Sequence, residues 1–138
     1  MRPRVQERRF ERPHGATLLT IAEQDLRTAT YAAGGVESGD ARPEAVLFLF
    51  QQAAEKAPKA AICVLDLPVP LVHDLGVLLA KLPEDEKPDV GYELTRLNEV
   101  AGVRRCEEGH LRYTDDDIEE ARSLVTDVVT YARSIVRR

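Results

Sequence analysis

The sequence contains no tryptophan, and aromatic residues make up only 5% of its 138 residues. With so few aromatic side chains, packed helices suit the chain better than a sheet sandwich. Only two cysteines are present, Cys63 and Cys106, which are too few for a disulfide framework and indicate a reducing compartment such as the cytoplasm. Cys63 lies within an apolar run, and we expect it to be an inert thiol in the core.

Long apolar runs are missing as well. No stretch approaches the ~20 residues that span a bilayer, and the N-terminus has no apolar signal core, so the sequence predicts neither a membrane segment nor export. The net charge of −5 argues against generic electrostatic binding to nucleic acid, so any such site needs a local basic patch. No set of residues has the spacing of a metal site, and the sequence predicts no cofactor.

Residues 1–14 form a basic N-terminal segment. The segment holds five arginines and two prolines: Arg2, Arg4, Arg8, Arg9 and Arg12, with Pro3 and Pro13. Because proline disrupts helices, we interpret these residues as a frayed arm. The functional alternative is an arm that touches an acidic partner or a phosphate backbone. Residues 15–138 then form a single helical domain, a length that suits one core.

The segment Leu47–Leu65 is the centre of the predicted fold. Its alanines recur at steps of three and four, which places them on one helix face and lets a neighbouring helix come close. These alanines are Ala53, Ala54, Ala57, Ala60 and Ala61. Asp40 is the expected N-cap of this helix, and Pro43 suits its first turn. Because Pro58 lacks an N–H, we expect either a kink there or a break followed by a restart.

Similar spacing predicts four further helices. They cover residues 16–33, about 72–82, about 92–103 and 114–136, and Gly34–Gly35 is expected to end the first with a left-handed cap. Thr114 and Asp117 resemble a capping box, and we assign the aspartates 115–117 to capping because successive helical residues diverge by about 100°. No segment alternates with period two. The sequence therefore predicts an all-α, up-and-down antiparallel bundle of about five helices.

Two polar features lie between the expected helices. His73 has a catalytic interpretation, but the more ordinary one is a structural histidine bonded to a neighbouring helix or to backbone. Residues 83–90, PEDEKPDV, are expected to be a solvated, mobile loop without an acid–base dyad.

Residues 51–57, QQAAEKA, together with Lys59–Ala60, resemble the hallmark helix of HEPN domains (higher eukaryotes and prokaryotes nucleotide-binding). The spacing to His73–Asp74–Leu75 is also similar to that family. So are an arginine at the end of the next helix, here Arg104 or Arg105, and the acidic start of the last helix. The similarity covers roughly residues 16–136, and Pro58 departs from it where the family usually has an apolar helix former.

The resemblance implies an all-α bundle that often forms homodimers. It also implies frequent pairing with a small nucleotidyltransferase, often in toxin–antitoxin operons. Some members of the family bind nucleotides or act as the partner of the transferase. Others are metal-independent ribonucleases that carry an arginine, four to six further residues and a histidine.

Residues 104–113, RRCEEGHLRY, contain that spacing, since four residues separate Arg105 from His110. Arginine can hold a phosphate with two donors, and a histidine near neutral pKa can take the proton from a ribose 2′-hydroxyl. Three interpretations stay open. The segment is a catalytic pair of Arg105 and His110, a nucleotide- or RNA-phosphate-binding patch of Arg104, Arg105, Arg112 and Tyr113, or only an interhelical turn.

Two function classes follow. The first is a nucleotide- or RNA-phosphate-binding module that acts with a nucleotidyltransferase partner. The second is a metal-independent ribonuclease toxin of the same fold, so the sequence leaves open whether the protein is an enzyme.

Overall fold

The computed structural model describes residues 5–89, 97–98 and 113–138. Within these residues the chain forms four helices: α1 (Arg12–Ala33), α2 (Pro43–Val64), α3 (Leu75–Ala80) and α5 (Asp115–Val136). The predicted all-α bundle is confirmed. Of the predicted helix at 92–103, only Leu97 and Asn98 are described, and both have helical backbone; the rest of that prediction lies outside the described residues.

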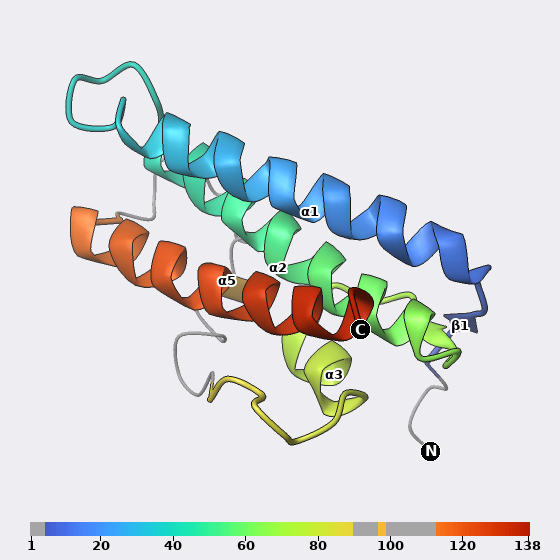
Figure 1. Cartoon of the computed structure of the whole chain (residues 1–138). Coiled ribbons are helices and arrows are strands. Elements are labelled where there is room, and N and C mark those ends of the chain that lie inside the picture. The colour runs from blue at the N-terminus through green and yellow to red at the C-terminus, as the bar shows by residue number, and fades with distance from the viewer. Residues whose placement is uncertain (1–4, 90–96, 99–112) are drawn as a thin grey trace.

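The three long helices pack against one another, and α2 contacts both α1 and α5 (Figure 1). α1 runs antiparallel to α2, as predicted for sequential helices, whereas α5 runs in the same direction as α2 (Figure 1). α3 lies beside the C-terminal half of α2. None of the helices in the described residues is long and apolar enough to cross a membrane.

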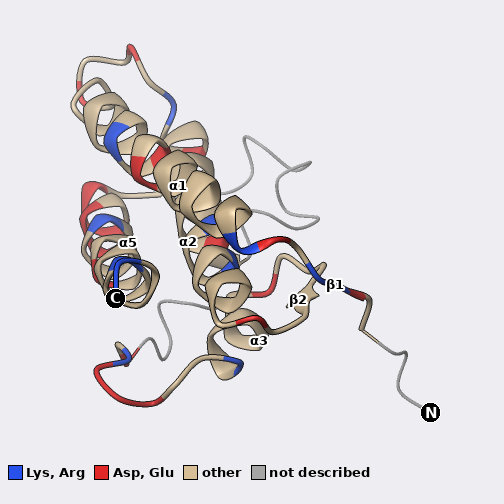
Figure 2. Ribbon diagram, turned by 45° about the vertical axis from the view of Figure 1, so that its right-hand side comes forward, with Lys and Arg blue, Asp and Glu red and all other residues tan. Residues whose placement is uncertain are grey.

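A short antiparallel ribbon corrects the expectation of a frayed arm. β1 (Glu7–Arg8) pairs with β2 (Val69–Pro70), and Leu71 N donates to Gln6 O at 2.8 Å (Figure 2). Phe10 then packs against the core. Strands of two residues carry no period-two pattern, which is why the sequence did not reveal them.

α1 begins at Arg12, four residues before the predicted start. Pro13 lies in the first turn of α1, where the absence of its N–H costs nothing, so this proline starts the helix and does not prevent it. The predicted end at Ala33 is confirmed, but Gly34 has a right-handed conformation with φ −65°. The left-handed glycine is Gly39, with φ 83°, in the following turn.

α2 runs without interruption through Pro58, so the predicted alternative of a break and restart is wrong. Pro43 lies in the first turn as predicted, but Arg42 holds the N-cap position. Asp40 N bonds Gly35 O at 2.9 Å and its carboxylate accepts from Ser38 Oγ at 2.9 Å. Asp40 therefore closes the preceding turn instead of capping the helix.

The alanine face of α2, defined as Ala53, Ala54, Ala57, Ala60 and Ala61, is buried as predicted. α1 approaches it closely at Gly15, where a Cβ would lie 2.6 Å from Val64 Cγ2 and 2.9 Å from Ala60 O. A glycine on α1 and small residues on α2 thus allow the two backbones to meet.

α5 begins with the predicted capping box, in which the side chains and backbone N–H groups of Thr114 and Asp117 bond reciprocally. Its buried stripe includes most of the predicted positions: Ile118, Ala121, Val125, Val128, Val129, Ala132 and Ile135. The described part of the 83–90 loop is mostly exposed, as expected. Tyr131 of α5 anchors it by donating a hydrogen bond to Pro83 O.

Candidate functional site

A buried carboxylate organises the polar side of α2. Glu55 is only 6% exposed, and its carboxylate accepts hydrogen bonds from Gln51 Nε2 at 3.1 Å and from Lys59 Nζ at 2.8 Å. Residues four apart lie above one another on a helix, so Gln51, Glu55 and Lys59 form one line, which we call the polar stripe. Gln52 Nε2, from the side of this line, donates to Gln51 Oε1 at 2.7 Å.

His73 completes the polar stripe from outside the helix. Its Nδ1 lies 3.0 Å from Glu55 Oε2 and 3.1 Å from Oε1. The predicted structural role, a bond to a neighbouring helix, agrees with this geometry. The side chain is nevertheless 75% exposed. When the proton is on Nδ1, the other ring nitrogen, Nε2, is a hydrogen-bond acceptor in this exposed side chain.

The electrostatics of Glu55 follow from these contacts. Burial acts to raise its pKa, but the hydrogen bonds from Lys59, His73 and Gln51 and the nearby charge of Lys59 outweigh burial, and the pKa ends below its ordinary value. Glu55 is therefore ionised at neutral pH, and its charge is balanced by donors on both sides.

Defined backbone features lie on both sides of His73 in the chain. α2 ends in a Schellman-type cap, in which Asp66 has φ 60° and Leu67 N donates to Ile62 O at 3.2 Å. After β2, Asp74 caps α3 by accepting from Gly76 N at 2.8 Å, so α3 begins at Leu75 and not at the predicted Val72. His73 lies between these two features, and its contact with Glu55 places it beside the middle of α2.

Residues on both sides of the predicted arginine site are well anchored. Asn98 Oδ1 accepts from Leu75 N at 3.2 Å, and Leu97 is 3% exposed in the core. Tyr113 is partly buried against the core, next to the capped start of α5. The structure thus places Tyr113 in packing contact, a role that the sequence did not predict for it.

The other predicted site residues, Arg104, Arg105, His110 and Arg112, lie outside the described residues, and so does Cys106. The structure therefore does not test the catalytic or phosphate-binding assignments. The predictions for these residues stay predictions.

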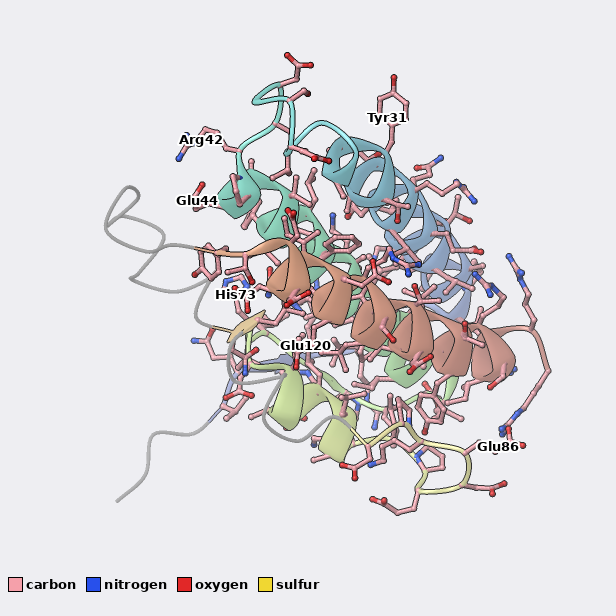
Figure 3. The ribbon with its side chains drawn as sticks, turned by 90° about the vertical axis from the view of Figure 1, so that its left-hand side faces the viewer. Tyr31, Arg42, Glu44, His73, Glu86 and Glu120 are labelled. Carbon is pink, nitrogen blue, oxygen red and sulfur yellow. The ribbon has the colours of Figure 1, made fainter. Side chains whose placement is uncertain are left out.

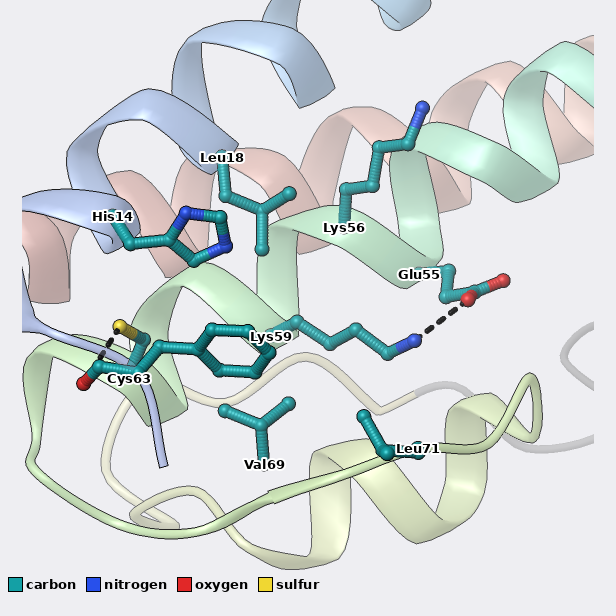
Figure 4. Close-up of a pocket in the computed structure, with 9 residues that line it drawn as sticks. His14, Leu18, Glu55, Lys56, Lys59, Cys63, Val69 and Leu71 are labelled. Atoms are coloured by element: carbon teal, nitrogen blue, oxygen red, sulfur yellow. Dashed lines mark hydrogen bonds and ion pairs between the residues drawn. The ribbon is translucent and has the colours of Figure 1, made fainter. Parts of the chain in front are cut away.

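A pocket of about 260 Å³ lies between the N-terminal segment and α2 (Figure 4). Its lining comes from three parts of the chain: Phe10, His14 and Leu18; Glu55, Lys56, Lys59 and Cys63; Val69 and Leu71. The rings of Phe10 and His14 stack with centroids 4.7 Å apart and an interplanar angle of 21°. Sequence reasoning missed this pocket because it assigned Phe10 and His14 to a frayed arm; an aromatic residue within a run of charges was the available signal.

Two charged contacts and a thiol complete the pocket. Lys56 Nζ bonds Asp25 Oδ2 of α1 at 2.6 Å, and Lys59 bonds Glu55. Cys63 Sγ lies 3.3 Å from Glu11 O, and burial chiefly raises the pKa of this thiol. The buried, protonated thiol agrees with the predicted inert role. In the part of the chain that the structure describes, no group of three or more potential ligands is placed to hold a metal ion.

Comparison with known proteins agrees with this architecture. The model of the HEPN domain family matches residues 16–135. The crystal structure of ST0689, an archaeal HEPN homologue, is similar with a TM-score of 0.68 and 23% sequence identity, covering 88% of this chain and 97% of that chain. At that identity the likeness shows the fold alone, and no curated protein matches the chain. Because the family model spans most of the chain, the protein belongs to the HEPN domain family.

Proposed function

We propose that this HEPN domain binds the phosphate groups of a nucleotide or an RNA through residues 104–113. The observation that carries the proposal is the concentration of Arg104, Arg105 and Arg112 in a chain whose net charge is −5. Arginine presents a planar fork of donors that matches phosphate oxygens. The neighbouring Glu107 and Glu108 offset part of this charge. Because contacts between arginine and phosphate are ionic, binding should weaken as the salt concentration rises.

The anchored residues beside this segment support the proposal. Leu97 and Asn98 are held against the core and α3, and Tyr113 and Thr114 are held at the start of α5. These contacts fix the two points between which the arginine segment runs. A phosphate-binding segment gains affinity when its ends are already ordered, because less conformational entropy is lost on binding.

A second function, metal-independent cleavage of RNA, is favoured by the spacing of Arg105 and His110. In this reaction His110 takes the proton from a ribose 2′-hydroxyl, and the 2′-oxygen attacks the adjacent phosphorus to form a 2′,3′-cyclic phosphate. The P–O5′ bond breaks, and the 5′-oxygen leaves with a proton taken from water. Arg105 would stabilise the charge that develops on the phosphate oxygens. The reaction needs no metal, so a chelator would not stop it.

The decisive experiment incubates the full-length protein with RNA and with nucleotides in chelator. If the segment only binds, Arg105→Ala weakens binding by about tenfold or more, and His110→Ala has little effect. If it cleaves, both substitutions abolish cleavage. Arg122→Ala is the matched control, since Arg122 is an exposed arginine on α5 paired with Glu119. Binding and cleavage that are unchanged in both site variants would refute the proposed function.

We further propose a cytoplasmic homodimer that acts with a small nucleotidyltransferase in a toxin–antitoxin system. Family membership supports this proposal, and so does apolar surface on α1, where Ile21 is 37% and Tyr31 is 89% exposed. Light scattering on the purified protein tests the dimer. Co-purification with the transferase, if its gene lies next door, tests the partner.

A further inference from the structure

We propose that His73 is a specificity-determining residue that accepts a hydrogen bond from the 2′-hydroxyl of a bound RNA. The inference rests on the proposed function in taking RNA as the ligand, and it deepens that function. The arginines of residues 104–113 would hold phosphates, which RNA and DNA share, whereas His73 distinguishes ribose from deoxyribose. The 2′-hydroxyl is the group by which a protein tells RNA from DNA at a given position.

The tautomer of His73 follows from its partner. Nδ1 lies 3.0 Å from Oε2 of Glu55 and 3.1 Å from Oε1. The pKa of Glu55 is lowered, so this carboxylate is ionised at neutral pH and only accepts hydrogen bonds. The proton of the neutral imidazole is therefore on Nδ1, and the second nitrogen, Nε2, is an acceptor.

An acceptor at the surface selects a donor on the ligand. The side chain of His73 is 75% exposed although its partner is buried, so the imidazole lies where a ligand can reach it (Figure 3). Phosphate oxygens are acceptors and cannot bond this nitrogen. Amino groups occur on only some bases, whereas every nucleotide of an RNA carries a 2′-hydroxyl. The ribose hydroxyl is therefore the donor that Nε2 can use whatever the base sequence.

Backbone contacts on both sides hold His73 in place. Two residues before it, Leu71 N donates to the backbone just before β1 at 2.8 Å. Two residues after it, Leu75 N donates to Asn98 Oδ1 at 3.2 Å. The imidazole is itself held by the buried Glu55. An acceptor that is already ordered loses little conformational entropy when a ligand binds.

The contact between Leu75 and Asn98 also relates His73 to the arginine segment. Arg104 follows Asn98 by six residues, so the chain between them extends over at most about 22 Å. One strand of a duplex rises about 3.4 Å per nucleotide, so a strand of ten nucleotides covers more than that distance. A single RNA strand is therefore long enough to contact the arginines and His73 together.

The test compares three single strands of ten nucleotides with one base sequence and uracil throughout: RNA, DNA and 2′-O-methyl RNA. Each is titrated with the full-length protein by fluorescence anisotropy at about pH 8, at the upper end of the range in which histidine changes charge. The 2′-O-methyl strand keeps the ribose oxygen but lacks the hydrogen that Nε2 accepts. We expect RNA to bind about fivefold more tightly than either other strand, the effect of one hydrogen bond. Equal affinity for the three strands would overturn the proposal.

Two substitutions at His73 separate recognition of ribose from a structural role. His73→Ala removes both ring nitrogens, whereas His73→Asn keeps an amide donor for Glu55 but has no atom at the position of Nε2. In both variants the preference for RNA over DNA should fall by about fivefold, because affinity for RNA drops and affinity for DNA does not.

His14→Ala is the matched control, since His14 is an exposed histidine that stacks on Phe10 and has no carboxylate partner among the described contacts. Its preference for RNA should equal that of the wild type, and circular dichroism checks that all variants are folded. A preference that persists in both His73 variants, or that is lost equally in His14→Ala, would contradict the assignment to His73.

The same strands separate this inference from the proposed function. Arg105→Ala should weaken RNA and DNA alike, because both present phosphates, and leave their ratio unchanged. If Arg105→Ala weakens both strands while the His73 variants keep the preference, the proposed function is supported and the inference is wrong. If Arg105→Ala changes neither strand while the His73 variants lose the preference, the ribose contact is supported and phosphate binding by Arg105 is not. Where the wild type cleaves the RNA, His110→Ala is added to every variant so that binding is measured on intact strands.

Discussion

The alanine face and the polar stripe lie on different sides of the same helix, α2. Close packing of small residues stabilises the first, and hydrogen bonds to a buried carboxylate stabilise the second. On the alanine face, small side chains let α1 approach until Gly15 meets Val64 and Ala60 O. On the polar stripe, the buried charge of Glu55 holds Lys59 and His73 by hydrogen bonds. The alanine face therefore depends on its side chains being small, and the polar stripe depends on the carboxylate of Glu55.

This difference determines how each surface responds to change. A close-packed face cannot accept added volume, because protein interiors have few voids. A buried polar cluster tolerates small changes of shape, but it cannot lose its central charge without leaving its partners unsatisfied. The two surfaces can therefore be tested by opposite substitutions, one that adds an atom and one that removes a charge. Figure 3 shows that His73 lies toward the surface, where water can replace a lost contact.

The largest effect is expected for Glu55→Ala, which removes the centre of the polar stripe. Gln51 is 0% exposed and Lys59 is mostly buried, so both lose an acceptor in a site with little water. We expect a loss of about 3 kcal/mol in the free energy of unfolding, measured by chemical denaturation. Glu55→Gln, which keeps the shape, should cost clearly less. Equal losses in the two variants would mean that volume, and not charge, holds the stripe.

A smaller effect is expected for Gly15→Ala on the alanine side. The new Cβ would lie 2.6 Å from Val64 Cγ2 and 2.9 Å from the backbone oxygen of Ala60, which cannot move away easily. Overpacking costs about 1–3 kcal/mol, and the better helix propensity of alanine returns about 1 kcal/mol. The net loss should be about 1 kcal/mol by thermal or chemical unfolding.

Gly35→Ala is the matched control for that substitution. A Cβ at Gly35 would make only contacts of 3.4 Å or more, and the glycine does not have positive φ. Its stability should change little. If both alanine variants behave alike, the close approach of α1 and α2 does not depend on Gly15.

The pH dependence of stability distinguishes the two surfaces, because the polar stripe contains ionisable side chains and the alanine face does not. The pKa of Glu55 is lowered from an ordinary value of 4.5 by Lys59, His73 and Gln51. The stabilisation from this group is therefore fully present above pH 4.5 and is lost as the pH falls through the lower pKa of the folded state. In unfolding experiments between neutral pH and pH 3, the difference between the wild type and Glu55→Gln should shrink on acidification. A difference that stays constant with pH would contradict the lowered pKa.

The two surfaces also differ in how far the sequence predicts them. The alanine face follows from steps of three and four, and the structure buries all five alanines. The alignment of Gln51, Glu55 and Lys59 follows from the same periodicity. The arrival of His73 does not, because it depends on the left-handed turn at Asp66 and on the pairing of β1 with β2. Such tertiary contacts leave no periodic signal.

The N-terminal segment also shows how far prediction from the sequence reaches, because its composition predicts disorder where the structure is ordered. Its arginines and prolines predict a frayed arm, whereas in the structure Pro13 starts α1 and Phe10 packs against the core. Proline has opposite consequences in the first turn and in the middle of a helix, and composition alone does not distinguish these positions. The pocket was missed for this reason, since two of its walls meet only after the segment folds back onto α2.

The smallest effect on stability is expected for His73→Ala. Glu55 keeps Gln51 and Lys59 as donors, and water can reach the position that the imidazole leaves, because the side chain is 75% exposed. A contact of this exposed kind is worth about 0.5 kcal/mol, so the unfolding midpoint should hardly move. The substitution therefore separates a structural from a functional role: if RNA binding or cleavage falls while stability holds, His73 acts on a ligand. If His73→Ala instead destabilises the fold as much as Glu55→Ala does, the histidine is a structural part of the polar stripe. There would then be no reason to assign it a role in binding or cleaving RNA.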